Sequence, residues 1–503
     1  MNVVWFKRDL RVSDHAPLTS ATQSGPTLAL YILEPLLWRE KDLSARHYAF
    51  LQQSLLDLQS QLKKLNFQLL IKIGQAEDVF TKLHQNLKIK AVFSHQETWN
   101  DWTYQRDKRV SKLFKTLSIP WHEFQHNGVV RKLASRDGWA KQWHHYMTAS
   151  SIALPARKYG LDTSIDSDNL PSPNKLNLSD DLCKSPQVGG RHFGLALLDS
   201  FFETRGKFYT KEMSSPVTAY ESCSRLSTYL AFGSISVREI YQLAQARKVA
   251  IYEQTPPGSP WRSSARSFLS RLRWHCHFIQ KLEDEPTIEL KNLHPAIDGL
   301  REGQFNDAHF EAWKEGRTGY PFIDACMRAL RATGWINFRM RAMLVSFSSN
   351  HLWLHWREPS LHLARLFLDY EPGIHYSQVQ MQSGATGINA IRIYNPIKQS
   401  IDQDLKGVFI KKWVPELASL STADIHTPWL AQNPPKNYPT PIVDEVTARR
   451  EANERLYSIR RSKNFQNLSA KIVKKHASRK KPFKTSKNKN EPSNVTGLQR
   501  ELF

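Results

Sequence analysis

The sequence predicts an α/β domain with a doubly wound parallel sheet, followed by an all-helical domain and a disordered basic tail. Three features of the 503 residues support this: strand-like runs that alternate with helical periodicity, a polar stretch between 151 and 190, and a tryptophan-rich helical stretch beyond it. The apolar content of 40% is enough for two or more cores. The four apolar, β-rich runs are Val3–Phe6, Thr27–Leu33, Phe67–Ile73 and Ile89–Phe93.

A helical period separates the second strand-like run from the third. Apolar residues recur three or four positions apart there, at Tyr48, Leu51, Leu55, Leu58, Leu62 and Leu65. Strands that alternate with helices predict a parallel sheet with a crevice at the strand ends. The G-x-G-x-x-G loop is absent, so we expect no dinucleotide in this domain, which we assign to residues 1–150.

The rest of the chain divides by composition. Residues 151–190 are rich in Ser, Asp, Asn and Pro, which is typical of a surface linker. Residues 191–436 read as helical, and their tryptophans suit either an ordinary core or a planar cofactor. Residues 437–503 form a basic stretch that we expect to stay extended, because its positive charges repel one another. The tail either solubilises the protein or contacts DNA, with salt-sensitive affinity. Its cations are Lys471, Lys474, Lys475, Arg479, Lys480, Lys481, Lys484, Lys487 and Lys489.

Charge and cysteine content narrow the functional classes. Lys and Arg total 70 against 47 Asp and Glu, and the net charge of +23 indicates nucleic acid or an anionic membrane as partner, or a soluble enzyme with a basic tail. Four cysteines without a C-x-x-C pair predict neither a disulfide framework nor a thiolate cluster. No apolar stretch reaches about 18 residues, so we expect no membrane segment. The few cysteines suit a reducing cytoplasm. We also expect a monomer. His275, Cys276 and His277 are adjacent on an expected helix and point apart, so no metal site is expected.

One segment has the residue types of a phosphate site. Ser224–Ser236 (SRLSTYLAFGSIS) places hydroxyls and an arginine before an apolar helical run. Hydroxyls and free backbone N–H groups at a helix start can hold a pyrophosphate. Taken alone, the same pattern is also that of an ordinary helix N-cap.

Five motifs in order give the segment a context. They are Trp5–Arg11 (WFKRDLR) with Asp14; Ser224–Ser227 (SRLS); Trp313–Pro321 (WKEGRTGYP) with Asp324, Ala325 and Met327; Thr333–Trp335 (TGW); and Trp413–Leu417 (WVPEL). Together they resemble the cryptochrome/photolyase family across about residues 1 to 420. The resemblance implies a helical domain that holds a U-shaped FAD. It also implies an α/β domain that can hold an antenna pigment; a folate or a deazaflavin are both open, and Glu97, Asn100 and Asp101 lie where pterin contacts would be sought.

The resemblance also assigns residues to FAD. Arg341 is expected to pair with Asp369 beside the isoalloxazine ring, with Tyr370 and Glu371 near the adenosine. Independently, a buried Arg and a buried Asp should pair because an unpaired buried charge is costly, so a purely structural salt bridge is the alternative. In the segment expected along the FAD phosphates, Cys223 replaces a hydroxyl residue that is often found at this position in the family. Along the FAD phosphates the resemblance places Tyr209, Ser224, Arg225, Leu226 and Ser227.

The sequence departs from the family where a DNA lesion would bind. Members that repair cyclobutane dimers have Glu-x-x-Trp in a helix; here Arg271 stands for the Glu, whereas Trp274 keeps a stacking platform for an extruded base. Arg271 can meet phosphate but cannot accept a hydrogen bond from thymine. Asn337 stands near the family's His-Asn-Arg or paired-His site and is a candidate polar contact. We expect Arg271, Trp274, His275 and Arg339 to contact DNA.

The family's electron relay is also altered. No Trp lies between Asp369 and Arg392, where the family normally has the tryptophan nearest the flavin. Trp356 matches a middle member of that relay. The inner step is therefore absent or rerouted, with Tyr370 and Tyr376 as candidates.

The last five residues, Gln499–Phe503 (QRELF), resemble the peptide by which bacterial repair proteins dock on the sliding clamp. Gln499, Leu502 and Phe503 would make the contacts, and a flexible arm would suit such a tethered ligand.

The leading hypothesis is an enzyme, a light-driven DNA photolyase in which excited reduced FAD donates an electron to a pyrimidine lesion flipped against Trp274. Trp274, Asn337 and Trp356 are then the candidate catalytic residues. The alternative is a cryptochrome-type photosensor without repair activity, favoured by the altered lesion site. A flavoprotein that binds DNA without photochemistry is the remaining class.

Overall fold

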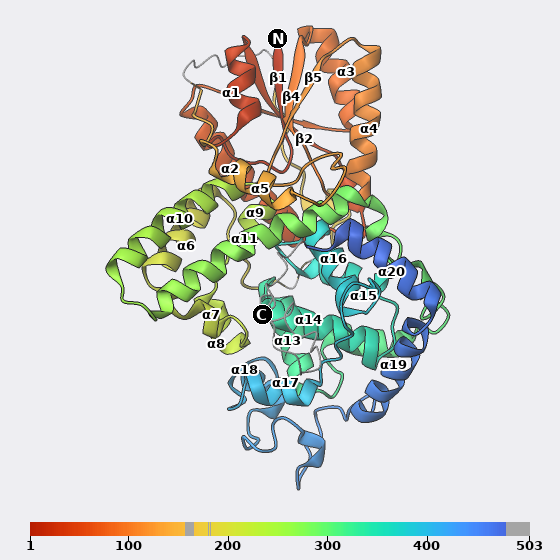
Figure 1. Ribbon diagram of the computed structural model, residues 1–503. Helices are drawn as coiled ribbons and strands as arrows, with labels where there is room; N and C mark the ends of the chain where they lie inside the picture. The colour runs from red at the N-terminus through yellow and green to blue at the C-terminus, as the bar shows by residue number, and fades with distance from the viewer. Residues whose placement is uncertain (156–164, 180, 182, 479–503) are drawn as a thin grey trace, which may run out of the picture.

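The computed structural model describes residues 1–155, 165–179, 181 and 183–478. Its N-terminal part is a five-stranded parallel sheet with strand order β3-β2-β1-β4-β5 (Figure 1). Four strands fall in the four predicted runs. The fifth was not predicted, because it has only four residues (WHEF), with two polar side chains at its centre, and lies at the sheet edge. The strands are β1 Asn2–Phe6, β2 Thr27–Leu33, β3 Leu69–Ile73, β4 Ala91–His95 and β5 Trp121–Phe124.

Helices cover both faces of this sheet. Side chains alternate across a strand, so Val3 and Trp5 pack on α3 and α4, whereas Val4 and Phe6 pack on the core that includes α1 and α2. This confirms the doubly wound α/β fold. The helices are α1 Ala16–Gln23, α2 Ala45–Lys63, α3 Ala76–Leu87, α4 Asp101–Thr116 and α5 Trp139–Thr148.

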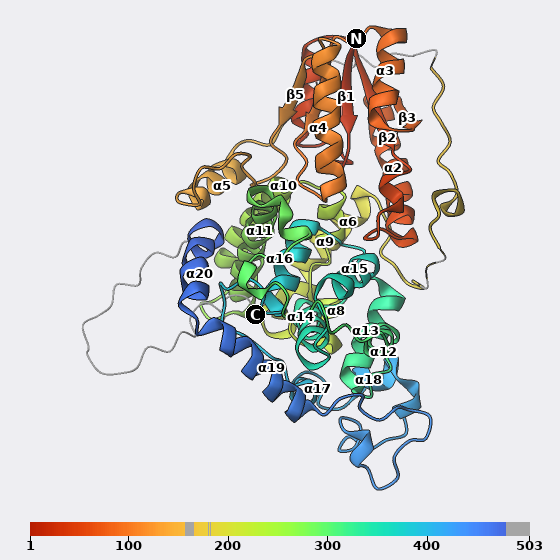
Figure 2. The ribbon, with the colours of Figure 1, turned by 90° about the vertical axis from the view of Figure 1, so that its right-hand side faces the viewer.

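The polar stretch after α5 packs along the sheet where the structure describes it. Ser167 Oγ accepts a hydrogen bond from the Ile71 N–H at 3.0 Å, and the Asp168 N–H donates to the Ile71 carbonyl at 2.9 Å. Leu176 and Leu178 are buried. The segment therefore covers the β3 edge, whose backbone groups would otherwise be unpaired, as it descends beside the sheet in Figure 2.

The second domain is built of helices, and α11 crosses it beneath the sheet (Figure 1). Helix α11 packs against α10 and α16. Helices α7, α9, α11, α14 and α16, with adjoining loops, surround the site described below. The helices are α6 Arg191–Glu203, α7 Tyr209–Glu212, α8 Pro216–Ser222, α9 Ser227–Ala231, α10 Val237–Gln254, α11 Pro260–Asp284, α12 Asp307–Glu315, α13 Pro321–Thr333, α14 Phe338–Ser346, α15 Arg357–Leu366, α16 Pro372–Gln382, α17 Pro396–Gln403 and α18 Val408–Trp413.

The loop after β1 joins the two domains. Arg8 Nε donates to the Ala231 carbonyl and Arg11 donates to the Gly233 carbonyl, each at 2.9 Å. Gly233 has a φ of +66°, and a Cβ there would lie 2.0 Å from the Arg8 carbonyl oxygen, so only glycine allows this approach. The Trp5–Arg11 motif thus fixes the helical domain against the sheet.

The expected extended tail from residue 437 is wrong for residues 445–476. They form α19 Glu445–Arg460 and α20 Lys463–His476, which run along the outer flank of the helical domain (Figure 2). Leu456 and Phe465 are buried, and Phe465 stacks on His294 with ring centroids 3.8 Å apart. Lys471, Lys474 and Lys475 lie on α20. Apolar anchors therefore outweigh the repulsion that the charge pattern suggested.

Residues 479–503 lie outside the described residues, and with them the clamp-like peptide Gln499–Phe503. Among the helices that the structure describes, none combines the length and the apolar character needed to cross a bilayer.

Candidate functional site

A large cavity lies in the helical domain, between α7, the start of α9, α11, α14 and α16. It contains about 1260 Å³ of empty space including its open side. The residues expected to hold FAD line it, with the exception of Tyr370. They are Tyr209, Ser224, Arg225, Leu226, Ser227, Arg341, Asp369 and Glu371. The candidate catalytic residue Asn337 also lines it, and so do the residues expected at DNA: Arg271, Trp274, His275 and Arg339.

We call Arg341, Asp369, Glu371 and Gln378 the Asp369 wall. Arg341 on α14 donates to both Asp369 oxygens at 2.9 Å, and its Nε donates to the Ile336 carbonyl at 2.8 Å. Burial alone would raise the pKa of Asp369, but the Arg341 charge and its hydrogen bonds lower it below the ordinary value. The carboxylate therefore stays ionised, and the pair forms a fixed dipole at the cavity surface.

Arg225, which also lines the cavity, has an unusual backbone conformation. Its φ is +61°, in the left-handed region, and its guanidinium lies 3.9 Å and 4.2 Å from the ring centroids of Tyr220 and Trp335. Ser227 begins α9, which has only five residues. The hydroxyls and Arg225 would therefore hold a phosphate through their own hydrogen bonds rather than through a long helix dipole. Burial raises the pKa of the neighbouring Cys223 thiol to about 12, so it stays neutral.

Several polar atoms around the cavity are buried and have no partner within the described residues. They belong to side chains of both sides of the cavity: Arg225 Nε, Trp274 Nε1, Glu371 Oε1 and Gln378 Oε1. Buried polar groups are normally hydrogen-bonded, so this pattern is typical of a site that a polar ligand completes. Burial raises the pKa of Glu371 to about 8, which lets its carboxyl group donate a hydrogen bond at neutral pH. These residues fit a cofactor as large and polar as FAD.

We call Arg271, Trp274, His275, Asn337 and Arg339 the Trp274 wall. Arg271 and Trp274 lie three residues apart on α11 and therefore share a face. The Trp274 ring stacks on Phe278 at 5.8 Å. Burial lowers the pKa of His275 to about 4, so this residue is neutral and offers hydrogen bonds rather than charge. The wall thus combines an aromatic face with the cations Arg271 and Arg339.

Asn337 is held in one orientation. Its Nδ2 donates to the carbonyls of Met213 at 3.1 Å and Ser214 at 2.7 Å. Two acceptors on one side fix the amide, since only the NH₂ group can serve both. The loop between α7 and α8 is thereby tied to the start of α14.

Tyr370 and Trp356 do not reach the cavity surface. The Tyr370 hydroxyl donates to Asp42 Oδ2 at 2.7 Å, on the side of the α/β domain. Trp356 is buried, and its Nε1 donates to Asn292 Oδ1 at 2.7 Å. Tyr370 lies instead in the wall of a smaller neighbouring cavity, together with His375. His375 Nε2 contacts the Ser360 carbonyl at 2.9 Å, and burial lowers the pKa of His375 to about 4.

The sequence analysis missed cavity residues of α11 and α16. Phe278, Ile374 and Gln378 line the cavity but belong to no motif. Ile374 and Gln378 are four residues apart, one turn along α16, and Phe278 follows Trp274 by the same spacing. The helical spacing from residues already named was therefore the available signal.

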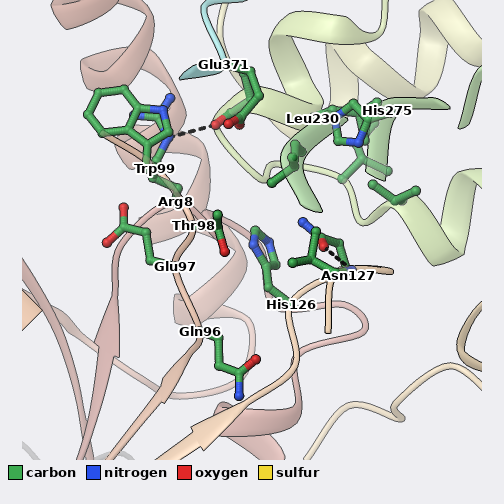
Figure 3. Close-up of a pocket in the computed structure, with 15 residues that line it drawn as sticks. Arg8, Gln96, Glu97, Thr98, Trp99, His126, Asn127, Leu230, His275 and Glu371 are labelled. Atoms are coloured by element: carbon green, nitrogen blue, oxygen red, sulfur yellow. Dashed lines mark hydrogen bonds between the residues drawn. The ribbon is translucent and has the colours of Figure 1, made fainter. Parts of the chain in front are cut away.

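A second cavity lies between the two domains and touches the first (Figure 3). It lies at the carboxyl ends of β1 and β4 and shares His275 and Glu371 with the large cavity. Arg8 lies 4.0 Å from the ring centroid of Trp99 there. Glu97 faces this space but also pairs with Arg106. An antenna pigment in the α/β domain stays a prediction, with folate and deazaflavin both open.

A buried acid–histidine cluster lies behind the same strand ends. Asp9 Oδ2 lies 2.9 Å from His15 Nε2 and 2.7 Å from His95 Nδ1, and these atoms are close enough to bind a metal ion. His15 Nδ1 also accepts the Leu18 N–H at the start of α1. Burial lowers the pKa of His95 to about 3, so its ring is neutral and bonds to the carboxylate. The three side chains satisfy one another, which accounts for the cluster structurally.

Comparison with known protein families identifies the family to which this fold belongs. The model described as the FAD binding domain of DNA photolyase matches residues 268–458, and the one described as DNA photolyase matches residues 2–141. The chain belongs to the cryptochrome/photolyase family. It therefore has the family's FAD-binding domain, and the residues from Arg271 to Gln378 that line the large cavity lie within the matched segment.

Relatives of both functional kinds are similar over almost the whole chain. A deoxyribodipyrimidine photo-lyase of Vibrio cholerae is 29% identical over 91% of this chain and 99% of its own. A cryptochrome DASH of Gloeobacter violaceus is 27% identical over 91% and 95%. A Sulfolobus tokodaii photolyase structure with two FAD molecules has a TM-score of 0.75 at 25% identity, covering 91% of this chain and all of that one. A class III photolyase structure from Agrobacterium tumefaciens has a TM-score of 0.78 at 24% identity, covering 92% and 98%, and supports the fold.

Proposed function

We propose that the protein is a blue-light-dependent DNA photolyase that binds FAD and splits UV-induced pyrimidine lesions. The observation on which this rests is that one cavity brings the Asp369 wall and the Trp274 wall together. A flavin on the first and an extruded base on the second would be in the same enclosed space. Electron transfer between two bound partners needs proximity and exclusion of water more than acid–base groups.

FAD, when bound, supplies light-driven one-electron chemistry. Arg341 and Asp369 present their paired charges to it, and Arg225, Glu371 and Gln378 have the unpartnered atoms that would meet its polar groups. Trp274 offers an aromatic face to an extruded base, worth about 1–3 kcal/mol per stacked base. Arg271 and Arg339 bring positive charge to the phosphates beside it.

The bulk properties of the chain are compatible with this role. The net charge of +23 favours a polyanionic partner, and damaged DNA is the partner that we propose. The photo-lyase relatives of Vibrio cholerae and Escherichia coli span 91% and 89% of the chain at 29% and 27% identity. The four cysteines are free, which fits a reducing, cytoplasmic environment.

A photosensor without repair activity is the second candidate. The observation that favours it is Arg271, which stands on the Trp274 wall where the family's dimer-repairing members have a carboxylate. An arginine offers only donors and cannot accept the N–H of a pyrimidine. The similarity to cryptochrome DASH extends over the same length as that to photolyases.

A repair assay separates the two candidates. Purified protein, loaded with FAD and reduced with dithionite, is mixed with oligonucleotides carrying a cyclobutane dimer or a six-four photoproduct and exposed to blue light, with a dark control. Chromatography then measures restored bases. Trp274→Ala should abolish repair, whereas Trp261→Ala, on the same helix but outside the cavity lining, should not. Repair of either lesion supports the photolyase; no repair of either by protein with bound FAD supports the photosensor.

A further inference from the structure

Two tyrosines and an aspartate form a buried cluster behind the Asp369 wall. Tyr370 and Tyr376 are 2% and 0% exposed. The Tyr370 hydroxyl donates to Asp42 Oδ2 at 2.7 Å, and the two phenol oxygens lie 3.2 Å apart. Asn100 Nδ2 also donates to Asp42 Oδ2 at 3.3 Å. The phenol of Tyr370 thus has a carboxylate at hydrogen-bonding distance and a second phenol beside it.

The cluster continues into a chain of buried aromatic rings. The ring centroid of Tyr376 lies 6.3 Å from that of Tyr370 and 6.3 Å from that of Trp356. Trp356 is 1% exposed. Its ring centroid lies 5.4 Å from that of His355, whose side chain is 23% exposed. The chain therefore runs from the back of the Asp369 wall to a position close to solvent.

Its inner end adjoins the flavin cavity. Tyr370 follows Asp369 directly in the chain and lines the smaller cavity. That cavity shares Arg341, Asp369 and Glu371 with the large one, so these residues border both the cavity that Tyr370 lines and the space that we assign to FAD.

The surroundings keep the phenols protonated in the resting state. Burial, and then the negative charge of Asp42, raise the pKa of Tyr370 well above its ordinary value. Burial and Asp42 likewise raise the pKa of Tyr376, and Arg357, whose guanidinium lies 5.1 Å from the Tyr376 ring centroid, acts against this. Glu289 lies in the same cluster, and burial raises its pKa to about 7. A neutral phenol loses its proton when it loses an electron, so it needs an acceptor in place. Asp42 is in that position.

We propose that Tyr370, Tyr376 and Trp356 form an electron relay to the flavin, with Asp42 as the proton acceptor of Tyr370. The proposal rests on the proposed FAD-dependent function. Its oxidant is oxidised FAD excited by light, the state that must be photoreduced before reduced FAD can act in repair. One electron leaves Tyr370 for the flavin while its phenolic proton moves to Asp42. One electron then passes from Trp356 by way of the Tyr376 ring to Tyr370, which takes its proton back from Asp42, so Tyr376 keeps its own proton. A thiol in solution gives one electron to the oxidised Trp356, becomes a thiyl radical and releases its proton to water. Each turn moves one electron inward.

The first test measures photoreduction rather than repair. FAD-loaded protein is illuminated with a thiol present, and the loss of oxidised-flavin absorbance is followed. Tyr370→Phe should slow photoreduction at least tenfold. Tyr320→Phe is the matched control, because Tyr320 is also buried but its hydroxyl donates to the Val443 carbonyl at 2.8 Å rather than to a carboxylate. An unchanged rate in Tyr370→Phe with bound FAD would overturn the relay.

The second test identifies the radical and the proton acceptor. Electron paramagnetic resonance of frozen illuminated protein should show a neutral tyrosyl radical that Tyr370→Phe removes. Wild-type photoreduction should slow in D₂O. Asp42→Asn keeps both phenols but removes the acceptor, so it should slow photoreduction and abolish the tyrosyl signal. A full tyrosyl signal in Asp42→Asn would exclude Asp42 as the acceptor. If Tyr370→Phe fails to retain FAD, Asp42→Asn and Trp356→Phe decide the outcome.

A chemically reduced sample separates this proposal from the proposed function. Dithionite bypasses the relay, so reduced Asp42→Asn should repair DNA as well as reduced wild type does. Failure of reduced wild type to repair would refute the photolyase and leave the relay intact. Normal repair by reduced protein with unchanged photoreduction in every relay variant would refute only the relay.

Discussion

The two walls of the large cavity are built differently. On the Asp369 wall, Arg341 bonds to Asp369 and to the Ile336 backbone, and Asp369 is buried. On the Trp274 wall, Arg271 and Trp274 are only partly buried on α11, and the carboxylate expected from the family is missing. The first wall is constrained by its own packing, whereas the second keeps partly exposed side chains, as the DNA contact that we propose requires. Functional divergence is therefore expected on the Trp274 wall, while the cofactor site stays constant.

Breaking the charge pair of the Asp369 wall should have the largest effect. Arg341→Ala leaves Asp369 buried without its partner, which typically costs about 3–5 kcal/mol. We expect loss of bound FAD and a lower melting temperature, measured by flavin absorbance and by calorimetry. Arg317→Ala is the control, because Arg317 pairs with Glu315 at the surface with a 62% exposed side chain. Full FAD content and unchanged melting in Arg341→Ala would mean that the wall does not depend on this pair.

The contrast between the walls also explains what the sequence could predict. The α/β and helical domains follow from strand-like runs and helical periods, and Ser224–Ser227 of the cavity belong to a motif of contiguous residues. The Asp42–Tyr370 hydrogen bond joins residues 328 positions apart, so no local pattern indicates it. The family resemblance placed Tyr370 near the adenosine of FAD. In the structure, its hydroxyl donates to Asp42 of the α/β domain.

The C-terminal helices were missed for a similar reason. The charge run that begins at Lys471 predicts an extended chain, but the partners of the contacts that hold the helices lie far from that run in the sequence. Phe465 stacks on His294, and Lys475 pairs with Glu285 at 2.6 Å, each partner coming from the distant segment around the end of α11. Such anchors depend on tertiary packing, which propensity and charge do not report.

Acid should weaken the side of the cavity behind the Asp369 wall. Burial lowers the pKa of His375 from 6.5 to about 4, and the Ser360 carbonyl offsets part of this. The neutral ring therefore stabilises the fold above pH 6.5, and this stability is lost as the pH falls through about 4. The shift corresponds to about 3 kcal/mol. His375→Gln should flatten the pH dependence of urea unfolding between pH 6.5 and 4. His192→Gln, at a 64% exposed side chain, should leave the wild-type slope, and an equally steep slope in both variants would contradict the assignment.

Removing the aromatic face tests the Trp274 wall alone. Trp274→Ala should weaken binding of lesion-containing DNA by about 1–3 kcal/mol, roughly 5- to 150-fold, because one stacked base loses its platform. FAD content should stay unchanged, since the Asp369 wall is intact. Fluorescence anisotropy with labelled oligonucleotides measures the affinity, and Trp261→Ala on α11 is the control. Loss of FAD together with DNA affinity would show that the two walls are not independent.

The smallest expected effect concerns Arg271. If its guanidinium neutralises one phosphate, Arg271→Ala should weaken binding to lesion-containing and undamaged duplexes alike and make the plot of log affinity against log salt shallower by about 0.9. Arg317→Ala, at the exposed surface pair, should leave the slope unchanged. If Arg271 instead contacts the extruded base, its loss should weaken binding to the lesion alone and leave the slope as in wild type. The first result makes the Trp274 wall a general DNA contact that tolerates loss of the carboxylate, and the second makes Arg271 the residue that selects the lesion.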